Sequence, residues 1–579
     1  MTQEMRRILV VQTTRMGDML QTSPLIRLLR RAHPKSHITV MIRKMSRSVA
    51  ECIPGIDEIF IYDEDEIFKN LRSSDSERLL RAYEMVVDYV KRIQGGKYDV
   101  AYNCAQSIGS ALLLKMAQVP IVIGAHYSAD WQFILRGRWT NYLFTSLRHR
   151  MYSDFNLCDV FRNLAYDDSG IEQNLVSQEI DPLSFEIHEQ HRQEARELLH
   201  KNGIADSAFL VAFQLGASEV QKRWPVHRFA GLARLLREKY DPAIVLLGVK
   251  DEAVLGQEFD QFYNLSTVKL FGQTTIPVLA AVLERANVLV TNDTGTMHIA
   301  AAVKCPTVVV SVGTVHFRET GPYGEGHCAI ECAQQLKTGV FHSSEGVIGE
   351  EDRGVIKPEQ VLKAVEVAIN HTGQQGTIPD EEGLSNVVIH RSAFAPDGCL
   401  EWYPVILRPI EETDLLRMAY RAMWLDFLRR REGDQDREIQ EINSIKRMLA
   451  HYLPAHEEIL DNVVTKQNSA FRELEEMARE GMSLTEDLLH LLQANRFLDS
   501  QPIVKKLSQL DERIRLHGEL NSWVKPLSAS AAFERGSLEG SNPVLLAQTT
   551  WHIYEDLLVR AHLMQIKLRT IKNCIQPQA

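Results

Sequence analysis

Short apolar runs alternate with longer segments of helical periodicity over the first two thirds of the chain. Runs rich in valine, isoleucine and leucine predict buried strands, and apolar residues three or four positions apart predict helices between them. The strands are predicted at residues 7–12, 38–42, 58–62, 98–103, 121–124, 209–213, 243–248, 286–290 and 307–310. The helices are predicted at residues 19–33, 76–93, 110–117, 185–201, 227–240 and 358–370. This alternation is typical of parallel sheets built from βα units.

The alternation falls into two successive blocks. We therefore predict an α/β protein with two Rossmann-like domains that face a cleft, the first at residues 1–184 and the second at residues 185–372. Neither block contains Gly-x-Gly-x-x-Gly, so an ordinary dinucleotide coenzyme is not expected.

The pattern changes after residue 372. Residues 373–410 are predicted to form a linker and a short β-hairpin around the turn sequence Ala395-Pro396-Asp397-Gly398. Residues 411–579 show long stretches of helical periodicity and predict a bundle of five or six helices. This last part contains no metal-ligand spacing and no arrangement of a nucleophile with a base, so its role stays open.

Length and charge limit the remaining possibilities. A chain of 579 residues is too long for one core and fits three folding units. The formal net charge of −11 argues against general nucleic-acid binding, which requires a basic face. The first apolar run is too short for a signal peptide, and no run reaches the ~18–20 apolar residues of a membrane span. We therefore expect a cytoplasmic protein.

The eight cysteines are scattered over the chain, so we expect most of them to be reduced and buried. Cys328 and Cys332 are the one close pair. Without a second pair or histidines at ligand spacing, they favour a structural role over a zinc site, although metal binding by this pair is left open.

Residues 126–152 interleave aromatic residues with arginines, among them Arg136 and Arg138. Such a mixture can bind an anionic, partly apolar partner such as a phosphorylated lipid headgroup at a membrane surface. The same composition also fits a loop whose aromatic residues cover the core while its arginines face water. The sequence favours the two interpretations equally.

The segment from Asn292 to Ala302 follows an apolar run and reads as a strand, a tight turn and the first turn of a helix. A helix start offers unpaired N–H groups and the positive end of a dipole, so this turn is a natural anion site. Gly295 lets a ligand approach the backbone, Thr294 adds a hydroxyl, and His298 could donate to a phosphate oxygen. Ordinary helix capping by the same residue types is the competing explanation.

Three segments, in this order along the chain, carry a resemblance to a known family. They are Arg15-Met16-Gly17-Asp18 with Pro24; Gly216-Ala217-Ser218 with Lys222-Arg223-Trp224-Pro225; and Asp293-Thr294-Gly295 with His298 and Gly321-Pro322-Tyr323-Gly324. Over residues 6–370 the chain resembles the ADP-heptose:lipopolysaccharide heptosyltransferases of glycosyltransferase family 9. The resemblance implies an inverting enzyme with the two-domain GT-B fold, a nucleotide-heptose donor, and neither a cofactor nor a catalytic metal.

The resemblance also implies roles for particular residues of the first domain, which would bind the acceptor. Asp18 looks like the general base that takes the proton of the attacking hydroxyl, whereas the bottom-up alternative is a cap on the following helix. Loops at the carboxyl ends of parallel strands line ligand crevices, which places Arg15 there as well. The residues expected on the acceptor side are Arg15, Gly17, Arg136 and Arg138.

The second domain would bind the nucleotide sugar. Lys222 looks like the cation that neutralises the departing diphosphate, which needs a positive charge if no metal serves. The other residues expected to hold the diphosphate are Ser218, Thr294, Gly295 and His298. Asp293 is expected to bind sugar hydroxyls or to fix its loop, because its charge repels phosphate. By analogy of spacing alone, Glu252 is expected to bind the ribose hydroxyls.

The leading hypothesis is the transfer of heptose from ADP-heptose to a lipopolysaccharide core or a related envelope glycan, with contact to the inner membrane surface. One alternative keeps the fold but changes the sugar or uses a protein acceptor. Another is a non-catalytic nucleotide-sugar scaffold, although the retention of Asp18, Lys222 and His298 argues against it. Residues 373–579 lie outside the resemblance, so the helical part could recognise the acceptor, bind a protein partner or drive oligomerisation.

Overall fold

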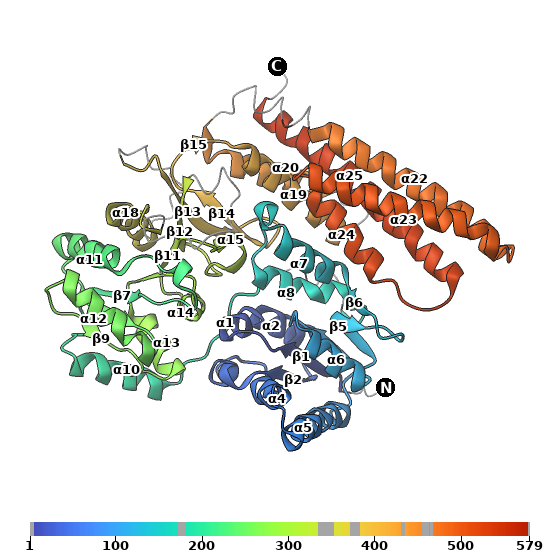
Figure 1. The fold of residues 1–579 in the computed structure, drawn as a ribbon. Helices are drawn as coiled ribbons and strands as arrows, with labels where there is room; N and C mark the ends of the chain where they lie inside the picture. Colours follow the sequence, from blue (N-terminus) through green and yellow to red (C-terminus); the bar gives the residue numbers. More distant parts are fainter. Residues whose placement is uncertain are drawn as a thin grey trace.

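The protein consists of two α/β lobes and a long helical bundle (Figure 1). The computed structural model describes residues 5–171, 176, 180–333, 353–370, 383–429, 435–453, 463 and 467–576. The predicted class, two Rossmann-like domains followed by a hairpin and a helical bundle, is confirmed. None of the described helices is long and apolar enough to cross a membrane.

The N-terminal lobe is built on a six-stranded sheet. Its strands are β1 (Arg7–Gln12), β2 (His37–Ile42), β3 (Glu58–Ile61), β4 (Val100–Asn103), β5 (Ile121–Tyr127) and β6 (Phe133–Arg136). The order is β3-β2-β1-β4-β5-β6, and every pairing is parallel except that of β5 with β6. The helices of this lobe are α1 (Met16–Gln21), α2 (Ser23–Ala32), α3 (Arg47–Ala50), α4 (Glu64–Leu71), α5 (Ser76–Gly95), α6 (Ile108–Met116), α7 (Arg138–Arg148) and α8 (Leu157–Asn163).

The second lobe has an eight-stranded sheet of order β14-β13-β12-β11-β10-β7-β8-β9. Its strands are β7 (Leu210–Gln214), β8 (Ala243–Leu247), β9 (Val268–Lys269), β10 (Val288–Thr291), β11 (Thr307–Ser311), β12 (Cys328–Cys332), β13 (Val387–Phe394) and β14 (Leu400–Pro404). Its helices are α10 (Glu189–Lys201), α11 (Val226–Tyr240), α12 (Ala253–Phe262), α13 (Ile276–Arg285), α14 (Gly295–Ala302), α15 (Phe317–Thr320) and α18 (Pro358–Ile369).

Both sheets reverse their strand order at the same topological point. The chain moves outward from β1 to β3 and returns to the other side of β1 with β4, and it repeats this path with β7 to β9 and β10. Ligands of open α/β sheets bind at such a reversal, beyond the carboxyl ends of the strands. The loops after β1, β4, β7 and β10 are therefore the ones placed to build a site.

The predicted helix at residues 19–33 is two helices in the structure. α1 ends at Gln21 and α2 begins at Ser23, with Pro24 in its first turn. The backbone N–H of Thr22 still donates to the carbonyls of Asp18 and Met19, but Pro24 has no N–H to continue the α1 pattern. Because of this break, α1 is a separate short helix at the edge of the lobe.

The hairpin predicted between the second lobe and the bundle is present as β13 and β14, and it joins the second sheet. β13 pairs antiparallel with β12, and β14 pairs antiparallel with β13. The hairpin therefore belongs to the core of the second lobe, whereas most of the predicted linker before it, residues 371–382, lies outside the described residues.

Six helices form the bundle in the part of the chain that the structure describes. They are α19 (Glu412–Arg429), α20 (Gln435–Leu449), α22 (Asn468–Gln493), α23 (Phe497–Leu520), α24 (Lys525–Gly536) and α25 (Pro543–Ile575). Two short strands, β15 (Arg408–Pro409) and β16 (Tyr452–Leu453), pair beside it. In Figure 1 the bundle, drawn in orange to red, lies against α7 of the N-terminal lobe.

The bundle covers the aromatic and basic segment at residues 126–152. This segment is not a loop but contains β6 and α7. Its Tyr142 ring packs edge-on against Trp424 of α19 with centroids 5.3 Å apart, and its Phe144 ring packs in the same way against Phe533 of α24 at 6.3 Å. These two rings therefore pack against another part of the same chain.

Arg136 and Arg138 also point to the bundle, so the expectation that they lie on the acceptor side of the cleft is wrong. Arg136 donates to both carboxylate oxygens of Glu539 at 2.9 Å. The Arg138 guanidinium lies 5.0 Å from the ring centroid of Phe427 and 3.7 Å from Asp556. The sequence correctly indicated that arginines and aromatic residues gather in this segment. The partner of Arg136, however, lies about 400 residues further along the chain.

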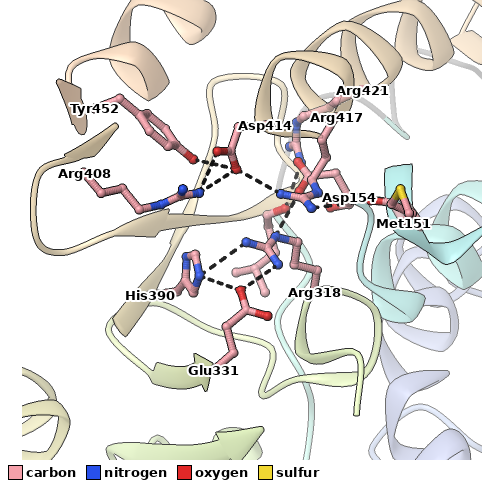
Figure 2. A network of polar contacts seen from close by, with 12 residues as sticks. Met151, Asp154, Arg318, Glu331, His390, Arg408, Asp414, Arg417, Arg421 and Tyr452 are labelled. Atoms are coloured by element: carbon pink, nitrogen blue, oxygen red, sulfur yellow. Dashed lines mark hydrogen bonds and ion pairs between the residues drawn. The ribbon is translucent and has the colours of Figure 1, made fainter. Parts of the chain in front are cut away.

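A buried ion-pair network joins the two lobes, the hairpin and the bundle (Figure 2). In the second lobe, Arg318 contacts Glu331 of β12, and Nε2 of His390 on β13 lies 2.8 Å from the same carboxylate. Although burial raises the pKa of Glu331, Arg318 and His390 together lower it to about 2. Arg421 of α19 donates to Asp154 of the N-terminal lobe at 3.1 Å. Each charged side chain of the network is buried next to an opposite charge. Burial of such a charge without a partner would be costly.

The attachment of the bundle can be tested at a second buried pair. Arg560 of α25 is fully buried and donates to both oxygens of Glu534, and Asn141 of α7 donates to the same carboxylate. Glu534→Ala leaves that guanidinium without a counterion, so we expect it to lower the free energy of unfolding by about 3 kcal/mol. Urea unfolding of the whole chain measures this change. Glu512→Ala removes an exposed pair with Arg515 on the same bundle and serves as the control, expected to leave the stability essentially unchanged. Equal losses in the two variants would contradict the role of Glu534.

Candidate active site

A cleft with a volume of about 1010 Å³ separates the two lobes. Its N-terminal wall comes from the loops after β1 and β4 and from α8, and its other wall comes from the loops after β7, β8, β10 and β11. The predicted site residues that line it are Arg15, Gly17, Asp18, Ser218, Lys222, Glu252, Asp293, Thr294, Gly295 and His298. The cleft therefore brings together four sequence segments, at residues 15–18, 218–222, 252 and 293–298.

The lobes approach each other where α1 faces α14. A Cβ on Gly17 would lie 2.8 Å from Cδ2 of His298, and a Cβ on Gly295 would lie 3.0 Å from Cε of Met16. Larger side chains at either glycine would push the two helix starts apart. The two glycines thus let the first turns of α1 and α14 border the same space.

Asp18 both caps α1 and borders the cleft. Its Oδ2 accepts a hydrogen bond from the backbone N–H of Arg15 at 3.0 Å and another from Oγ1 of Thr14 at 2.6 Å. Asp18 therefore does cap the helix, which was the alternative to a catalytic role, but the cap uses only Oδ2. Among the described residues, no hydrogen bond engages Oδ1, so this oxygen can receive a proton while Oδ2 fixes the orientation of the group.

Lys222 and Asp293 form an ion pair on the opposite wall. Nζ of Lys222 donates to Oδ2 of Asp293 at 3.3 Å, and it lies 3.9 Å from Glu219. Both side chains of the Lys222–Asp293 pair are mostly buried but still reach the cleft. Arg15 reaches across from the N-terminal lobe to within 3.9 Å of the same Glu219. Glu219 therefore lies close to one cation from each lobe, Arg15 and Lys222.

The start of α14 supplies neutral donors. Thr294 is its N-cap, and its hydroxyl lies 3.4 Å from that of Thr291. His298 is buried, and this burial lowers its pKa, which keeps the imidazole neutral at pH 7 even though Asp293 and Asp18 act in the other direction. Its Nδ1 has no hydrogen-bond partner among the described residues. A neutral imidazole and free N–H groups suit an anion at this helix start.

Glu252 is held at the edge of the cleft by the end of β7. Its Oε2 accepts hydrogen bonds from Nε2 of Gln214 and from the backbone N–H of Val249, each at 3.1 Å. A Cβ on Gly216 would collide with Oε1 of Glu252, so the carboxylate packs flat against that glycine. Gln214 in turn accepts from Thr296 at 3.1 Å. The carboxylate is thus fixed between the β7 and β8 loops, where a ribose could donate to it.

Asn292 is a site residue whose role the sequence did not reveal. Its Nδ2 donates to the carbonyl of Leu215 at 2.9 Å, and its Oδ1 accepts from the backbone N–H of Trp224 at 2.9 Å. The fully buried side chain therefore ties the β10 turn to both ends of the loop that carries Ser218 and Lys222. A polar residue that directly follows an apolar strand was the available indication. Ser218 itself lies exposed on that loop.

The cysteines are all free, as expected, and six of the eight are buried. Cys328 and Cys332 form the two ends of β12 and lie outside the cleft. Within the described ranges, no group of three or more His, Cys, Asp or Glu is placed to hold a metal ion.

Comparison with known proteins agrees with this geometry. The family model "Glycosyltransferase family 9 (heptosyltransferase)" matches residues 86–343. The chain is therefore a glycosyltransferase, and a purely non-catalytic scaffold is disfavoured. The glycosyltransferase family 9 match contains Lys222 and the Asp293 turn, whereas Asp18 precedes it.

Two curated relatives extend the likeness over most of their own length. Lipopolysaccharide heptosyltransferase 3 of Escherichia coli is 24% identical over 302 residues, which cover 52% of this chain and 82% of the relative. Lipopolysaccharide heptosyltransferase 2 of E. coli K12 is 26% identical over 324 residues, with the same two coverages. A solved family 9 glycosyltransferase from Veillonella parvula aligns with a TM-score of 0.49 and 24% identity over 64% of this chain and 98% of that protein.

The bridge made by Asn292 gives a prediction for this glycosyltransferase. Asn292→Ala removes the link between the β10 turn and the Lys222 loop, so we expect a loss of about 2 kcal/mol in the free energy of unfolding and a roughly tenfold weaker affinity for ADP. Denaturant unfolding and calorimetry with ADP measure the two effects. Asn287→Ala is the control, because Asn287 accepts from the backbone N–H of Leu210 at the opposite end of β10. An equal loss of ADP affinity in the Asn287 variant would show that the Asn292 link has no specific role.

Proposed function

We propose that the protein is an inverting, metal-independent heptosyltransferase that moves heptose from ADP-heptose to a hydroxyl of a lipopolysaccharide core or a related envelope glycan. The observation that carries this proposal is the position of Asp18 across one cleft from Lys222 and the start of α14. The names of the two E. coli relatives support the donor sugar and the acceptor class. We place the reaction in the cytoplasm.

In this reaction the acceptor oxygen attacks the anomeric carbon of the heptose from the side of the N-terminal lobe. Asp18 takes the hydroxyl proton as the new carbon–oxygen bond forms, which makes that hydroxyl increasingly acidic. The bond from the anomeric carbon to the diphosphate oxygen breaks on the opposite side, so the configuration inverts. The electron pair of that bond leaves with ADP.

The second lobe stabilises the charge that builds up on ADP. Lys222 exchanges Asp293 for the diphosphate, and the N–H groups of Gly295 and Thr296 with the Thr294 hydroxyl add neutral donors. Asp293 is then released from its ion pair and accepts hydrogen bonds from sugar hydroxyls. Glu252, held by Gln214, binds the ribose hydroxyls. A lysine and a helix start thus provide the positive charge that the leaving group requires.

Asp18→Asn tests the base. Because an asparagine oxygen can still accept from Arg15 and Thr14, we expect the fold and the affinity for ADP to stay the same while kcat falls about 10²–10⁴-fold. Mass spectrometry of the transfer product and calorimetry with ADP measure the two quantities. Asp88→Asn, on the exposed face of α5, is the control and should leave both unchanged. Turnover at the wild-type rate in Asp18→Asn would remove the assigned base.

Lys222→Ala tests the leaving-group site. The loss of the lysine that pairs with Asp293 should weaken ADP binding about tenfold and lower kcat about 10²-fold or more, because the charge is greatest in the transition state. Calorimetry with ADP, GDP and UDP on the wild type, followed by donor hydrolysis with ADP-heptose, defines the nucleotide against which the variant is compared. Lys269→Ala, which removes an exposed pair with Asp260, is the control. Unchanged affinity and rate in Lys222→Ala would contradict the assignment.

A further inference from the structure

Glu319 of α15 is a buried glutamate in the wall of the cleft, and it has no role in the proposed reaction. Its residue is 2% exposed, and both Oε1 and Oε2 lack a hydrogen bond. Among the described residues, it is the only carboxylate with both oxygens in this condition. Buried polar groups almost always have partners, and a carboxylate without them is costly. Such a group is complete only when a ligand donates to it.

A positive charge close to Glu319 comes from the opposite lobe. Nε of Arg150, on η2 (Arg150–Tyr152) of the N-terminal lobe, lies 3.3 Å from Oε2 of Glu319. That nitrogen is also buried and makes no hydrogen bond. Burial raises the pKa of Glu319, Arg150 lowers it, and the carboxylates of Asp293 and Asp18 raise it again. The charges of Asp18 and Asp293 therefore act on Glu319 from the cleft that all three border.

The surroundings of Glu319 place it toward the acceptor. The N-terminal lobe contributes Leu147, Leu157 and Phe161 to the cleft together with Arg150. The groups assigned to the nucleotide lie instead on the loops after β7 and β8 and at the start of α14. A carboxylate with two free acceptor oxygens at a partly apolar wall matches the hydroxyl pair of a sugar ring, which presents two donors side by side.

The position of Glu319 is fixed from behind by the ion-pair network. Its neighbour Arg318 contacts Glu331 at 3.4 Å and Asp154 at 3.9 Å, and Figure 2 shows Arg318 pointing into that network, beside His390. The carbonyl of Phe317 accepts from the N–H of Gly321 at 2.7 Å and closes the short helix. α15 thus carries one side chain held by the hairpin and both lobes, and the next one facing the cleft. A rigid support of this kind is what a positioning group requires.

We propose that Glu319 is an acceptor-positioning residue, whose two oxygens accept hydrogen bonds from hydroxyls of the acceptor sugar beside Arg150. The proposal rests on the proposed function, since it names which substrate of that cleft Glu319 binds. Proton transfer stays with Asp18, and Glu319 forms no covalent bond. The bundle contributes to the site through this helix, because its arginines share the network that holds Arg318.

The test is a steady-state comparison of Glu319→Gln with the wild type. The donor is ADP-heptose, and the acceptor probe is de-acylated lipopolysaccharide that lacks its terminal heptose. We expect the acceptor KM to rise at least tenfold, the ADP affinity to stay within twofold and the pH dependence of kcat to keep its shape. Glu325→Gln, at an exposed glutamate five residues beyond α15 and outside the cleft, is the control and should change none of these values.

Three results would overturn the proposal. An unchanged acceptor KM would remove Glu319 from acceptor binding. An equal loss of ADP affinity would assign it to the donor, and a displaced limb of the pH profile would assign it to proton transfer. If Glu319→Gln does not fold, as judged by its melting temperature, Glu319→Asp keeps the charge and shortens the reach by one methylene, and the same criteria apply to it.

The experiment separates this proposal from the proposed function. If wild-type protein neither transfers nor hydrolyses the heptose of ADP-heptose, the proposed function fails. Glu319 is then tested in the same way with the nucleotide sugar that calorimetry and product analysis identify. If the wild type transfers heptose but Glu319→Gln has an unchanged acceptor KM, only the inference about Glu319 fails.

Discussion

The close approach of α1 and α14 is the constraint on which the rest of the site depends. Gly17 and Gly295 have no side chains, and this lets two helix starts from different lobes border one space. Each helix follows a strand next to the point where its sheet reverses order. The carboxylate of Asp18 and the anion site at Thr294 are thereby brought to opposite walls without any direct bond between them. A bulkier residue at either glycine would widen the cleft that both walls share.

Ion pairs hold the charged side chains of the cleft in place. Lys222 rests on Asp293, and Arg150 rests on Glu319 across the lobes. Each pair contains one group that suits a phosphate or a carboxylate and one that suits hydroxyls. In the proposed reaction Lys222 leaves Asp293 for the diphosphate, whereas Arg150 stays beside Glu319.

The helical bundle is part of the same mechanical unit as the two lobes. It contacts α7 through rings such as Phe533 and the end of β6 through the Arg136–Glu539 pair, and Arg421 of α19 bonds to Asp154 of the N-terminal lobe. The hairpin that leads to it completes the second sheet. The network in Figure 2 therefore supports α15 on the side away from the cleft. The bundle affects the cleft through its contacts with this network, and none of its described residues contributes to the cleft lining.

Local pattern determined much of this protein. The apolar runs identified β1 and the other central strands, because a strand buried on both faces must be apolar throughout. The turn at Asp293 was also readable as a helix start that could bind an anion or simply be capped, whereas Lys222 was singled out only through the family resemblance. The break at Thr22 was missed, although Pro24 marked it.

Only the tertiary structure decided which residues share a space. Arg136 is compatible with a membrane surface, with water or with a partner helix, and its contact with Glu539 lies about 400 residues away in sequence. Asn292 and Glu319 carry no distinctive motif, and their importance comes from bonds made or left unmade in a buried setting. Burial and partnership depend on how distant segments pack, and the local order of residues does not contain this information.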